Sequence, residues 1–347
     1  MDHDLVAALD IGGTKIAGAL VDRDGVPHHR TRLPTPARET GDRVFAAVAG
    51  VLGALRSAPG WDRVTAVGIG SAGPVDARRG TVSPVNIPGW RDYPLVEGVR
   101  AAVGGLPVTL VGDGVAMTAA EHAGGAARGC AGALGMVVST GVGGGLVLDG
   151  RPYPGPTGNA GHIGHLSVDL DGERCPCGGR GCVERLASGP SIVRHARALG
   201  WRPGDGEDAG AAGVAAAARA GHPAAEAAFA RAARALAAAI AATAALTEIE
   251  TAVIGGGVAQ AGDVLFGPLR AALADYATLS FVRGLRVVPA AIGNDAGLVG
   301  AAAACRAAAT GPAAAAAAGT ASAPDAQSGP APAPPAGPVP VPAPTPR

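Results

Sequence analysis

Near the start of the chain stands the stretch Leu5-Val6-Ala7-Ala8-Leu9-Asp10-Ile11-Gly12-Gly13-Thr14-Lys15. Its apolar first half predicts a buried strand, and residues 16–21 predict a second strand after the glycine turn. In such a turn, glycines let backbone N–H groups close on phosphate oxygens, and Thr14 adds a hydroxyl donor. Asp10 could hold magnesium directly or through water, because that ion favours carboxylates. Taken alone, the motif is explained equally well by an ordinary hairpin turn.

A second glycine-rich turn stands in Ser139-Thr140-Gly141-Val142-Gly143-Gly144-Gly145. It belongs to a strand-turn-strand predicted over 135–148 and broken by glycines 141–145. Two such turns indicate a duplicated architecture that grips one nucleotide from both sides of a cleft. Gly255-Gly256-Gly257 follows a strand predicted over 252–254 and could admit an adenine or ribose close to the backbone. A helix-packing role explains these last glycines equally well.

Three of the five cysteines gather in Cys175-Pro176-Cys177-Gly178-Gly179-Arg180-Gly181-Cys182, with His165 before them and Glu184 just after. Three thiolates and one imidazole satisfy the tetrahedral preference of structural zinc, and the glycines let the backbone turn tightly around one point. A surface loop with incidental thiols is the weaker alternative. We therefore predict a structural zinc bound by His165, Cys175, Cys177 and Cys182. Such a site leaves no open position for water, which argues against a zinc hydrolase.

Three further polar residues are candidates for the site. Asp113 follows a short strand predicted over 108–111, at the strand end where open α/β sheets bind ligands. Its carboxylate could act as a general base or cap the helix predicted over 115–126. Asn86, on a proline-bounded loop, could bind sugar hydroxyls or stabilise a turn. Glu184 could accept hydroxyl hydrogen bonds or simply begin a helix.

Composition limits the kind of protein. The 347 residues carry 28 basic and 28 acidic side chains and no basic cluster, so neither nucleic acid nor a membrane surface is an expected partner. No charged-then-apolar leader opens the chain, and every stretch of about 18 apolar residues is interrupted by Gly or by a charged residue. Three thiols are grouped as metal ligands, and Cys130 and Cys305 stand outside that group. This distribution suits a reducing compartment better than a disulfide framework does. We expect a cytoplasmic protein.

Outside the motifs, the sequence alternates strands and helices. A strand is predicted over 64–69, a largely buried helix over 223–246, a last strand over 286–289 and a last helix over 296–306. From about residue 308 the chain contains mainly Ala, Pro, Gly and Ser, so residues 308–347 are predicted to be disordered.

Taken in order over residues 5–306, these motifs resemble the ROK family of sugar kinases and sugar-responsive repressors. The resemblance implies an α/β fold of the two-lobed hexokinase–actin type, which is a ribonuclease-H-like ATPase fold, with ATP and sugar meeting in the cleft and a structural zinc knot. Residues 1–114 would form the N-terminal lobe and residues 115–294 the C-terminal lobe with the zinc motif. A helix at about 295–307 would pack back on the first lobe. The family also suggests a homodimer.

The resemblance implies roles for individual residues. Asp113 matches the catalytic base, and Asn86 and Glu184 match sugar contacts. His165 matches a zinc ligand whose other ring nitrogen can reach the sugar, and His162 stands beside it in the same loop. The positions on the ATP side are Asp10, Gly12, Gly13, Thr14, Lys15, Thr140, Gly141, Gly256 and Gly257.

Two departures bear on the substrate. His162 stands where glucokinase-like members usually carry Glu, and Gly112 stands where an Asn usually precedes the catalytic Asp. Gly-His-Ile-Gly-His before the cysteines is similar to bacterial N-acetylmannosamine kinases. We therefore predict that the chain uses Mg-ATP to phosphorylate the 6-hydroxyl of N-acetylmannosamine, with glucose as the alternative.

A sugar-sensing regulator without catalysis is a further alternative. Repressors of the family carry a DNA-binding domain before the kinase fold, and this chain begins within a few residues of its first predicted strand. The sequence therefore favours the kinase.

Overall fold

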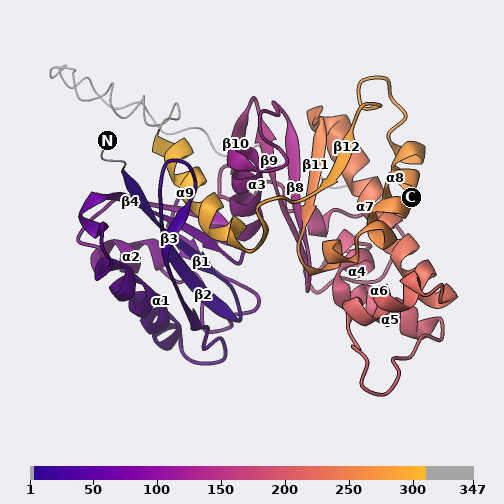
Figure 1. Cartoon of the computed structure of the whole chain (residues 1–347), viewed down its shortest axis with the longest axis horizontal. Coiled ribbons are helices and arrows are strands. Elements are labelled where there is room, and N and C mark those ends of the chain that lie inside the picture. Colours follow the sequence, from indigo (N-terminus) through magenta and orange to yellow (C-terminus); the bar gives the residue numbers. More distant parts are fainter. Residues whose placement is uncertain (1–3, 310–347) are drawn as a thin grey trace, which may run out of the picture. The chain divides into compact units, whose positions relative to one another are not determined.

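Two five-stranded sheets organise residues 4–309, the residues that the computed structural model describes (Figure 1). The first sheet has the order β3-β2-β1-β4-β7 and the second β10-β9-β8-β11-β12. The strands of the first sheet are β1 (Leu5–Ile11), β2 (Lys15–Val21), β3 (Pro27–Pro34), β4 (Val64–Ser71) and β7 (Val108–Gly112). Those of the second are β8 (Ala133–Val138), β9 (Val142–Leu148), β10 (Arg151–Tyr153), β11 (Thr251–Gly255) and β12 (Arg286–Pro289).

Both sheets are built in the same way. In each, two antiparallel pairings join the first three strands, and two parallel pairings add the remaining strands beside the first one. This repeated order confirms the duplicated architecture predicted from the two glycine-rich turns. We call the part around the first sheet the N-terminal lobe and the part around the second sheet the C-terminal lobe.

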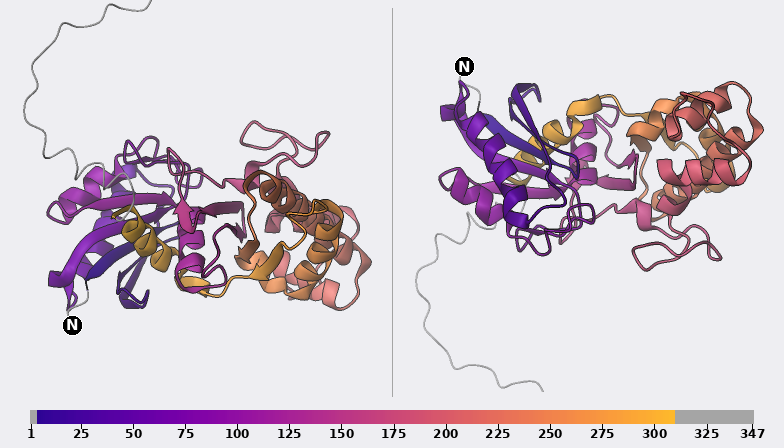
Figure 2. Two further views of the ribbon diagram at one scale, coloured as in Figure 1. Left: turned by 90° about the horizontal axis from the view of Figure 1, so that it is seen from above. Right: turned by 90° about the horizontal axis from the view of Figure 1, so that it is seen from below.

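The apolar run of β1 lies at the centre of its sheet, between β2 and β4, and its residues from Leu5 to Leu9 are buried. A strand covered on both faces needs such a continuous apolar run. One face is covered by α1 (Gly41–Arg56) and α2 (Leu95–Ala102). The other face carries α9 (Ala296–Ala309), although this helix comes last in the described chain (Figures 1 and 2).

Two helices join the lobes. α3 (Asp113–Gly124) packs along α9 and also against β8 and β9 of the second sheet. α9 packs on β1 and β4, where Gly68 lets its backbone approach the Ala301 carbonyl. The helix predicted over 296–306 therefore runs three residues further, and the predicted disorder from 308 begins inside α9. Residues 310–347 of that prediction lie outside the described residues.

A group of helices completes the C-terminal lobe. These helices are α4 (Val183–Ala187), α5 (Gly189–Ala198), α6 (Ala211–Arg219), α7 (Pro223–Thr247) and α8 (Asp263–Tyr276). By length and composition alone α7 could cross a membrane, yet α4, α5, α6 and α8 surround it and most of its side chains are buried. It is the core helix of its lobe, as its almost wholly apolar sequence predicted.

Short elements fill the connections. β5 (Val75–Asp76) and β6 (Thr81–Val82) form a small hairpin beside the first sheet. The 3-10 turns are Trp61–Arg63, Ile163–His165, Gly257–Ala261 and Gly293–Asp295.

The structure corrects two predicted boundaries. Glycines 143–145 belong to β9, where they pair with β8, so the turn itself is confined to residues 139–141. α3 spans Asp113–Gly124 instead of residues 115–126, which makes Asp113 its first residue.

Candidate active site

The turn between β1 and β2, residues 12–14, is called the first turn here. Thr35, just beyond β3, fixes it by donating its hydroxyl hydrogen bond to the Gly12 carbonyl at 2.7 Å and its N–H to the Thr14 carbonyl at 3.1 Å. Among the described residues, no protein acceptor is found for the N–H groups of Gly13 and Thr14. A β-carbon at Gly13 would lie 2.5 Å from Nδ2 of Asn86, so a glycine is needed for Asn86 to lie on this turn.

The turn between β8 and β9, residues 139–141, is the second turn. Its Ser139 carbonyl accepts the Gly189 N–H at 2.8 Å, and Oε2 of Glu184 accepts the Val142 N–H at 2.9 Å. A β-carbon at Gly141 would stand 2.7 Å from the same oxygen of Glu184. Over the described chain, the N–H groups of Thr140 and Gly141 have no protein acceptor. Each turn therefore offers backbone donors to an anion.

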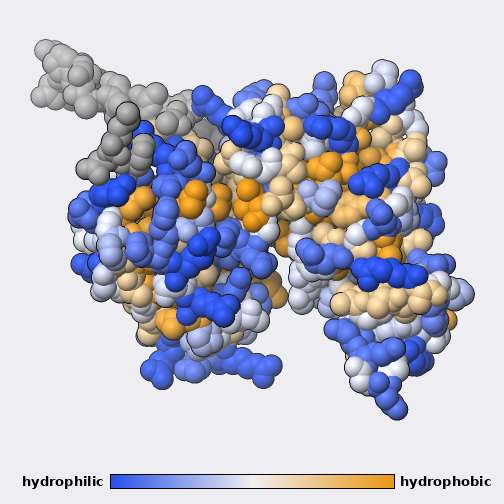
Figure 3. Space-filling model, in the orientation of Figure 1, coloured by the Kyte–Doolittle hydropathy of each residue, from blue (hydrophilic) through white to orange (hydrophobic). Residues whose placement is uncertain are grey.

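Asp113 lies beside the second turn. Its Oδ1 accepts the Gly114 N–H at 2.7 Å and lies 3.9 Å from where a β-carbon of Gly143 would stand. Asp113 is exposed to solvent. Figure 3 shows that the surface is hollowed between the two lobes. Protein atoms still surround enough of it that desolvation raises its pKa, against the lowering effect of the Gly114 N–H. A carboxylate of this kind can accept a proton from a hydroxyl.

Asp10 is the second carboxylate of the site. Burial raises its pKa, the Lys15 ammonium opposes that rise, and the charge of Asp113 adds to it. The two carboxylates are therefore close enough to influence each other. Such a pair favours a bound cation between or beside them, because a cation would stabilise both in the ionised state.

The predicted zinc ligands come together. The sulfurs of Cys175, Cys177 and Cys182 and a ring nitrogen of His165 all lie within 4.8 Å of one another. The Cys175 sulfur is 3.7 Å from His165 Nδ1, and the Cys177 and Cys182 sulfurs are 3.7 Å apart. A tetrahedron with bonds of about 2.3 Å has edges of about 3.8 Å, so this donor set fits zinc.

The thiols also need a cation for electrostatic reasons. Burial and the neighbouring cysteines raise the pKa of Cys182 to about 12, whereas the Gly179 N–H lowers the pKa of Cys177. Three thiolates cannot share this space at neutral pH without a compensating charge.

The loop before the cysteines brings two imidazoles together. The rings of His162 and His165 are stacked, with centroids 5.2 Å apart. Because Nδ1 of His165 faces the thiols, its Nε2 is left for another partner. Partial desolvation and His165 lower the pKa of His162, while the charge of Glu184 opposes them, which places these three residues in one group. The His162 ring also lies 3.9 Å from where a β-carbon of Gly73 would stand.

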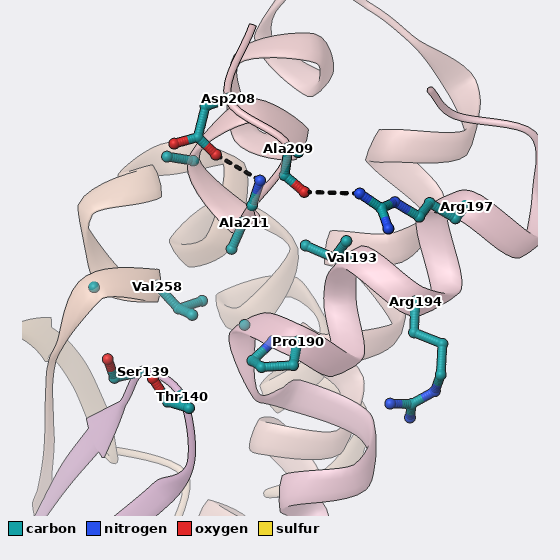
Figure 4. A pocket seen from close by; sticks show the side chains of 14 residues that line it. Ser139, Thr140, Pro190, Val193, Arg194, Arg197, Asp208, Ala209, Ala211 and Val258 are labelled. Atoms are coloured by element: carbon teal, nitrogen blue, oxygen red, sulfur yellow. Dashed lines mark hydrogen bonds between the residues drawn. The ribbon is translucent and has the colours of Figure 1, made fainter. Parts of the chain in front are cut away.

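A pocket of about 750 Å³ begins at the second turn and extends into the C-terminal lobe (Figure 4). Its wall contains Ser139, Thr140, Gly257 and Val258, together with residues of α5 and residues 208–212. In Figure 4 the Arg197 guanidinium donates a hydrogen bond to the Ala209 carbonyl, and this contact measures 3.3 Å. Gly256 has φ +91°, and a β-carbon there would lie 2.5 Å from the Val138 carbonyl oxygen, so the backbone passes the end of β8 closely.

The structure brings several of the predicted residues together in groups. Asn86 lies on the first turn, Asp113 and Glu184 lie beside the second turn, and His162 is stacked on His165. The sequence alone does not indicate the pocket residues of α5 and of residues 208–212, such as Arg194 and Asp208. No motif marks them, and only the fold brings them beside Gly257.

The model of the ROK family matches residues 6–308, which is most of the chain. The chain belongs to the ROK family. Its fold is accordingly the hexokinase-like α/β fold of that family, as predicted.

Two curated relatives bear different names. The glucokinase of Streptomyces coelicolor is 35% identical over 313 residues, covering 86% of this chain and 96% of that protein. The N-acetylmannosamine kinase of Yersinia pseudotuberculosis is 39% identical over 203 residues, covering 56% of this chain and 64% of that protein.

Two solved structures show the same fold. The ROK glucokinase of Streptomyces griseus in complex with glucose and AMPPNP has a TM-score of 0.72 and 34% identity, and the match covers 86% of this chain and 98% of that one. A ROK transcriptional regulator described as a homologue of the E. coli MLC protein has a TM-score of 0.77 and 27% identity, covering 87% and 78%.

Proposed function

We propose that this chain is an ATP-dependent sugar kinase that phosphorylates the 6-hydroxyl of a hexose derivative. The observation that carries the proposal is the position of Asp113, whose carboxylate faces the space beside the second turn. There Asp113 would accept the proton of the attacking hydroxyl as a general base. Phosphoryl transfer depends mainly on positioning and on charge stabilisation, which the free N–H donors of the two turns supply.

The nucleotide would lie between the two turns. The pocket next to Thr140 supports this placement, because it could take the base and ribose while Thr140 and Gly141 face the phosphates. Gly256 and Gly257 would let the ribose approach the backbone. On the other side, the first turn with Lys15 would contact the phosphates, and Asp10 would hold the magnesium ion that neutralises their charge.

The sugar would lie against Asn86 and the loop that carries His162, His165 and Glu184. N-acetylmannosamine is favoured by His162, which replaces the carboxylate usual in glucokinases, and by the 39% identity to an N-acetylmannosamine kinase. Glucose is the second candidate, favoured by the relatives that match nearly their full length.

Zinc would be structural. His165, Cys175, Cys177 and Cys182 would bind it, and the ion would order the loop that carries the sugar-binding residues. The cytoplasmic location stays a prediction from composition, and the homodimer stays a prediction of the family resemblance.

A coupled ADP-release assay tests the proposal. Mg-ATP is offered with N-acetylmannosamine, glucose, N-acetylglucosamine or mannose, and Asp113→Asn is assayed beside the wild type. We expect turnover with N-acetylmannosamine that is lost in the variant. Preference for glucose would replace the favoured substrate with the second candidate. Nucleotide binding without turnover on any of the four sugars would favour a sugar-sensing regulator. The fold of this chain is also similar to that of the solved ROK regulator.

A further inference from the structure

We infer that Glu184 positions the second turn for the nucleotide and thereby couples sugar binding to nucleotide binding. The inference rests on the proposed kinase function and assigns Glu184 a task beyond contacting the sugar. One of its carboxylate oxygens holds the turn, which leaves the other for a sugar hydroxyl.

The contact with the turn is direct. Oε2 of Glu184 accepts the Val142 N–H at 2.9 Å, where the turn passes into β9. Gly141 makes the approach possible, because a β-carbon there would lie 2.7 Å from the same oxygen. A hydrogen bond to a charged acceptor is stronger than one between neutral groups. Glu184 therefore fixes the conformation of the turn where it joins β9.

The opposite end of Glu184 is held firmly. Its carbonyl accepts the Ser188 N–H at 3.2 Å and the Ser191 hydroxyl at 3.0 Å. The helix that carries it, α4, begins directly after Cys182 of the predicted zinc site and packs on α7. The carboxylate thus projects from a rigid support to the turn.

The hydrogen bond between Glu184 and Val142 also determines which backbone N–H groups of the second turn can face the phosphates. Because the Val142 N–H is occupied by Glu184, the donors left in the turn are the N–H groups of Thr140 and Gly141. The helix that carries Glu184 also contacts the 3-10 turn Ile163–His165, and the Val183 N–H beside Glu184 donates to the Leu166 carbonyl at 3.0 Å, so Glu184 stands against the sugar loop as well. A sugar hydroxyl on Oε1 would restrict the carboxylate that holds the turn.

Two ligands that depend on one side chain are energetically coupled. If sugar orders Glu184, the nucleotide then binds to a turn that is already ordered, and its affinity rises. Reciprocity requires the nucleotide to raise the sugar affinity by the same factor. This coupling would favour nucleotide binding in the productive complex over nucleotide binding alone.

The test measures the affinity for Mg-AMPPNP by calorimetry, with and without a saturating sugar that the wild type phosphorylates. Glu184→Ala removes both contacts, whereas in Glu184→Gln the amide oxygen can still accept the Val142 N–H. Asp171→Asn, which neutralises an exposed carboxylate in the loop that precedes α4, is the matched control. Zinc content and melting temperature establish that each variant is folded. If Glu184→Ala does not fold, Gly141→Ala displaces the carboxylate from the side of the turn.

We expect Glu184→Ala to lose about tenfold in nucleotide affinity without sugar, as for a lost bond to a charged acceptor. Glu184→Gln should stay much closer to the wild type, and Asp171→Asn should equal it. The sugar-induced gain in nucleotide affinity, typically about 5–150-fold for coupled sites, should vanish in Glu184→Ala. Wild-type nucleotide affinity in Glu184→Ala, or an undiminished gain, overturns the inference. A wild type that phosphorylates no sugar, with nucleotide affinity still lost in Glu184→Ala, refutes the kinase proposal and supports the role of Glu184 in the turn.

Discussion

The carboxyl group of Asp10 lies directly against Gly297. A β-carbon at position 297 would stand 2.5 Å from Cγ of Asp10 and 2.6 Å from its Oδ2. Gly297 is the second residue of α9, whereas Asp10 lies near the end of β1, beside the first turn. The last helix therefore determines where the predicted magnesium ligand can lie, and only glycine leaves room for it.

This contact predicts the effect of Gly297→Ala. The added methyl group should displace the Asp10 carboxylate and lower kcat about tenfold or more, as small misplacements of positioning groups do. Steady-state kinetics with varied Mg-ATP measures the effect. Gly53→Ala is the control, because a β-carbon there meets no atom within 4 Å. In the interior of α1 that change should raise stability by about 0.5–1 kcal/mol. Unchanged kcat in Gly297→Ala would argue against a role for Asp10.

Asp113→Asn should abolish phosphoryl transfer while ligands still bind. Removal of a general base typically lowers the rate by about 10²–10⁴. The amide keeps the shape of the side chain, and its oxygen can still accept the Gly114 N–H. Rapid-quench kinetics and equilibrium binding of Mg-AMPPNP separate the two effects. A variant that retains more than about a tenth of the wild-type rate would exclude Asp113 as the base.

Activity should also fall as the pH decreases through the raised pKa of Asp113. Desolvation raises the pKa of Asp113 above the ordinary value of 3.8, and only the ionised base accepts a proton. The acid limb of kcat/KM should therefore have its midpoint above 3.8, and activity should fall tenfold for each further pH unit. A midpoint at or below the ordinary value would contradict this assignment.

The same shift sets the sign of its effect on stability. The folded state favours the protonated form of Asp113. Its contribution to folding stability is therefore largest below pH 3.8 and declines as the pH rises through the pKa of the folded state. Asp113→Asn should therefore melt no earlier than the wild type at neutral pH. A lower melting temperature there would contradict this sign.

Much of the fold was predictable because its signals are local. The apolar run of β1, the glycines that follow it and the almost wholly apolar α7 each lie within one short window. The cluster of predicted zinc ligands was predictable for the same reason, since three of the four residues lie within eight consecutive positions. The helical spacing of buried residues in α1 is an equally local signal.

Other features depend on contacts between distant residues. Nothing near Gly297 in the sequence indicates that it touches Asp10, and nothing near Glu184 indicates that it bonds Val142. Glycines 143–145 looked like part of a turn because a glycine run lacks the side chains that mark a strand. In the structure they are strand residues that pair with β8, and the close approach of Gly161 to Gly144 and of α3 to Gly145 leaves no room for a side chain.

Removal of zinc should damage the sugar site more than the nucleotide pocket. We expect one zinc per chain by elemental analysis, and loss of sugar affinity after chelation, because the cysteines order the loop that carries His162 and His165. Nucleotide affinity should fall less, since most of the pocket is formed by α5 and residues 208–212. Cys177→Ser should reproduce the effect of chelation. Undiminished sugar affinity in the metal-free protein would refute the structural role.

Glu121 should be among the most sensitive positions for stability. Its carboxylate, fully buried in α3, accepts N–H groups of Ala126, Ala291 and Ile292 at 2.8–2.9 Å. Residues 290–295 connect β12 to α9, so Glu121 ties this connection between the lobes to α3. In Glu121→Gln one acceptor oxygen becomes an NH₂ group facing backbone donors, and we expect a loss of about 2–3 kcal/mol in unfolding free energy. Glu226→Gln, on the exposed side of α7, should change stability by less than about 0.5 kcal/mol. Equal denaturation midpoints for the two variants would show that the connection holds without the carboxylate.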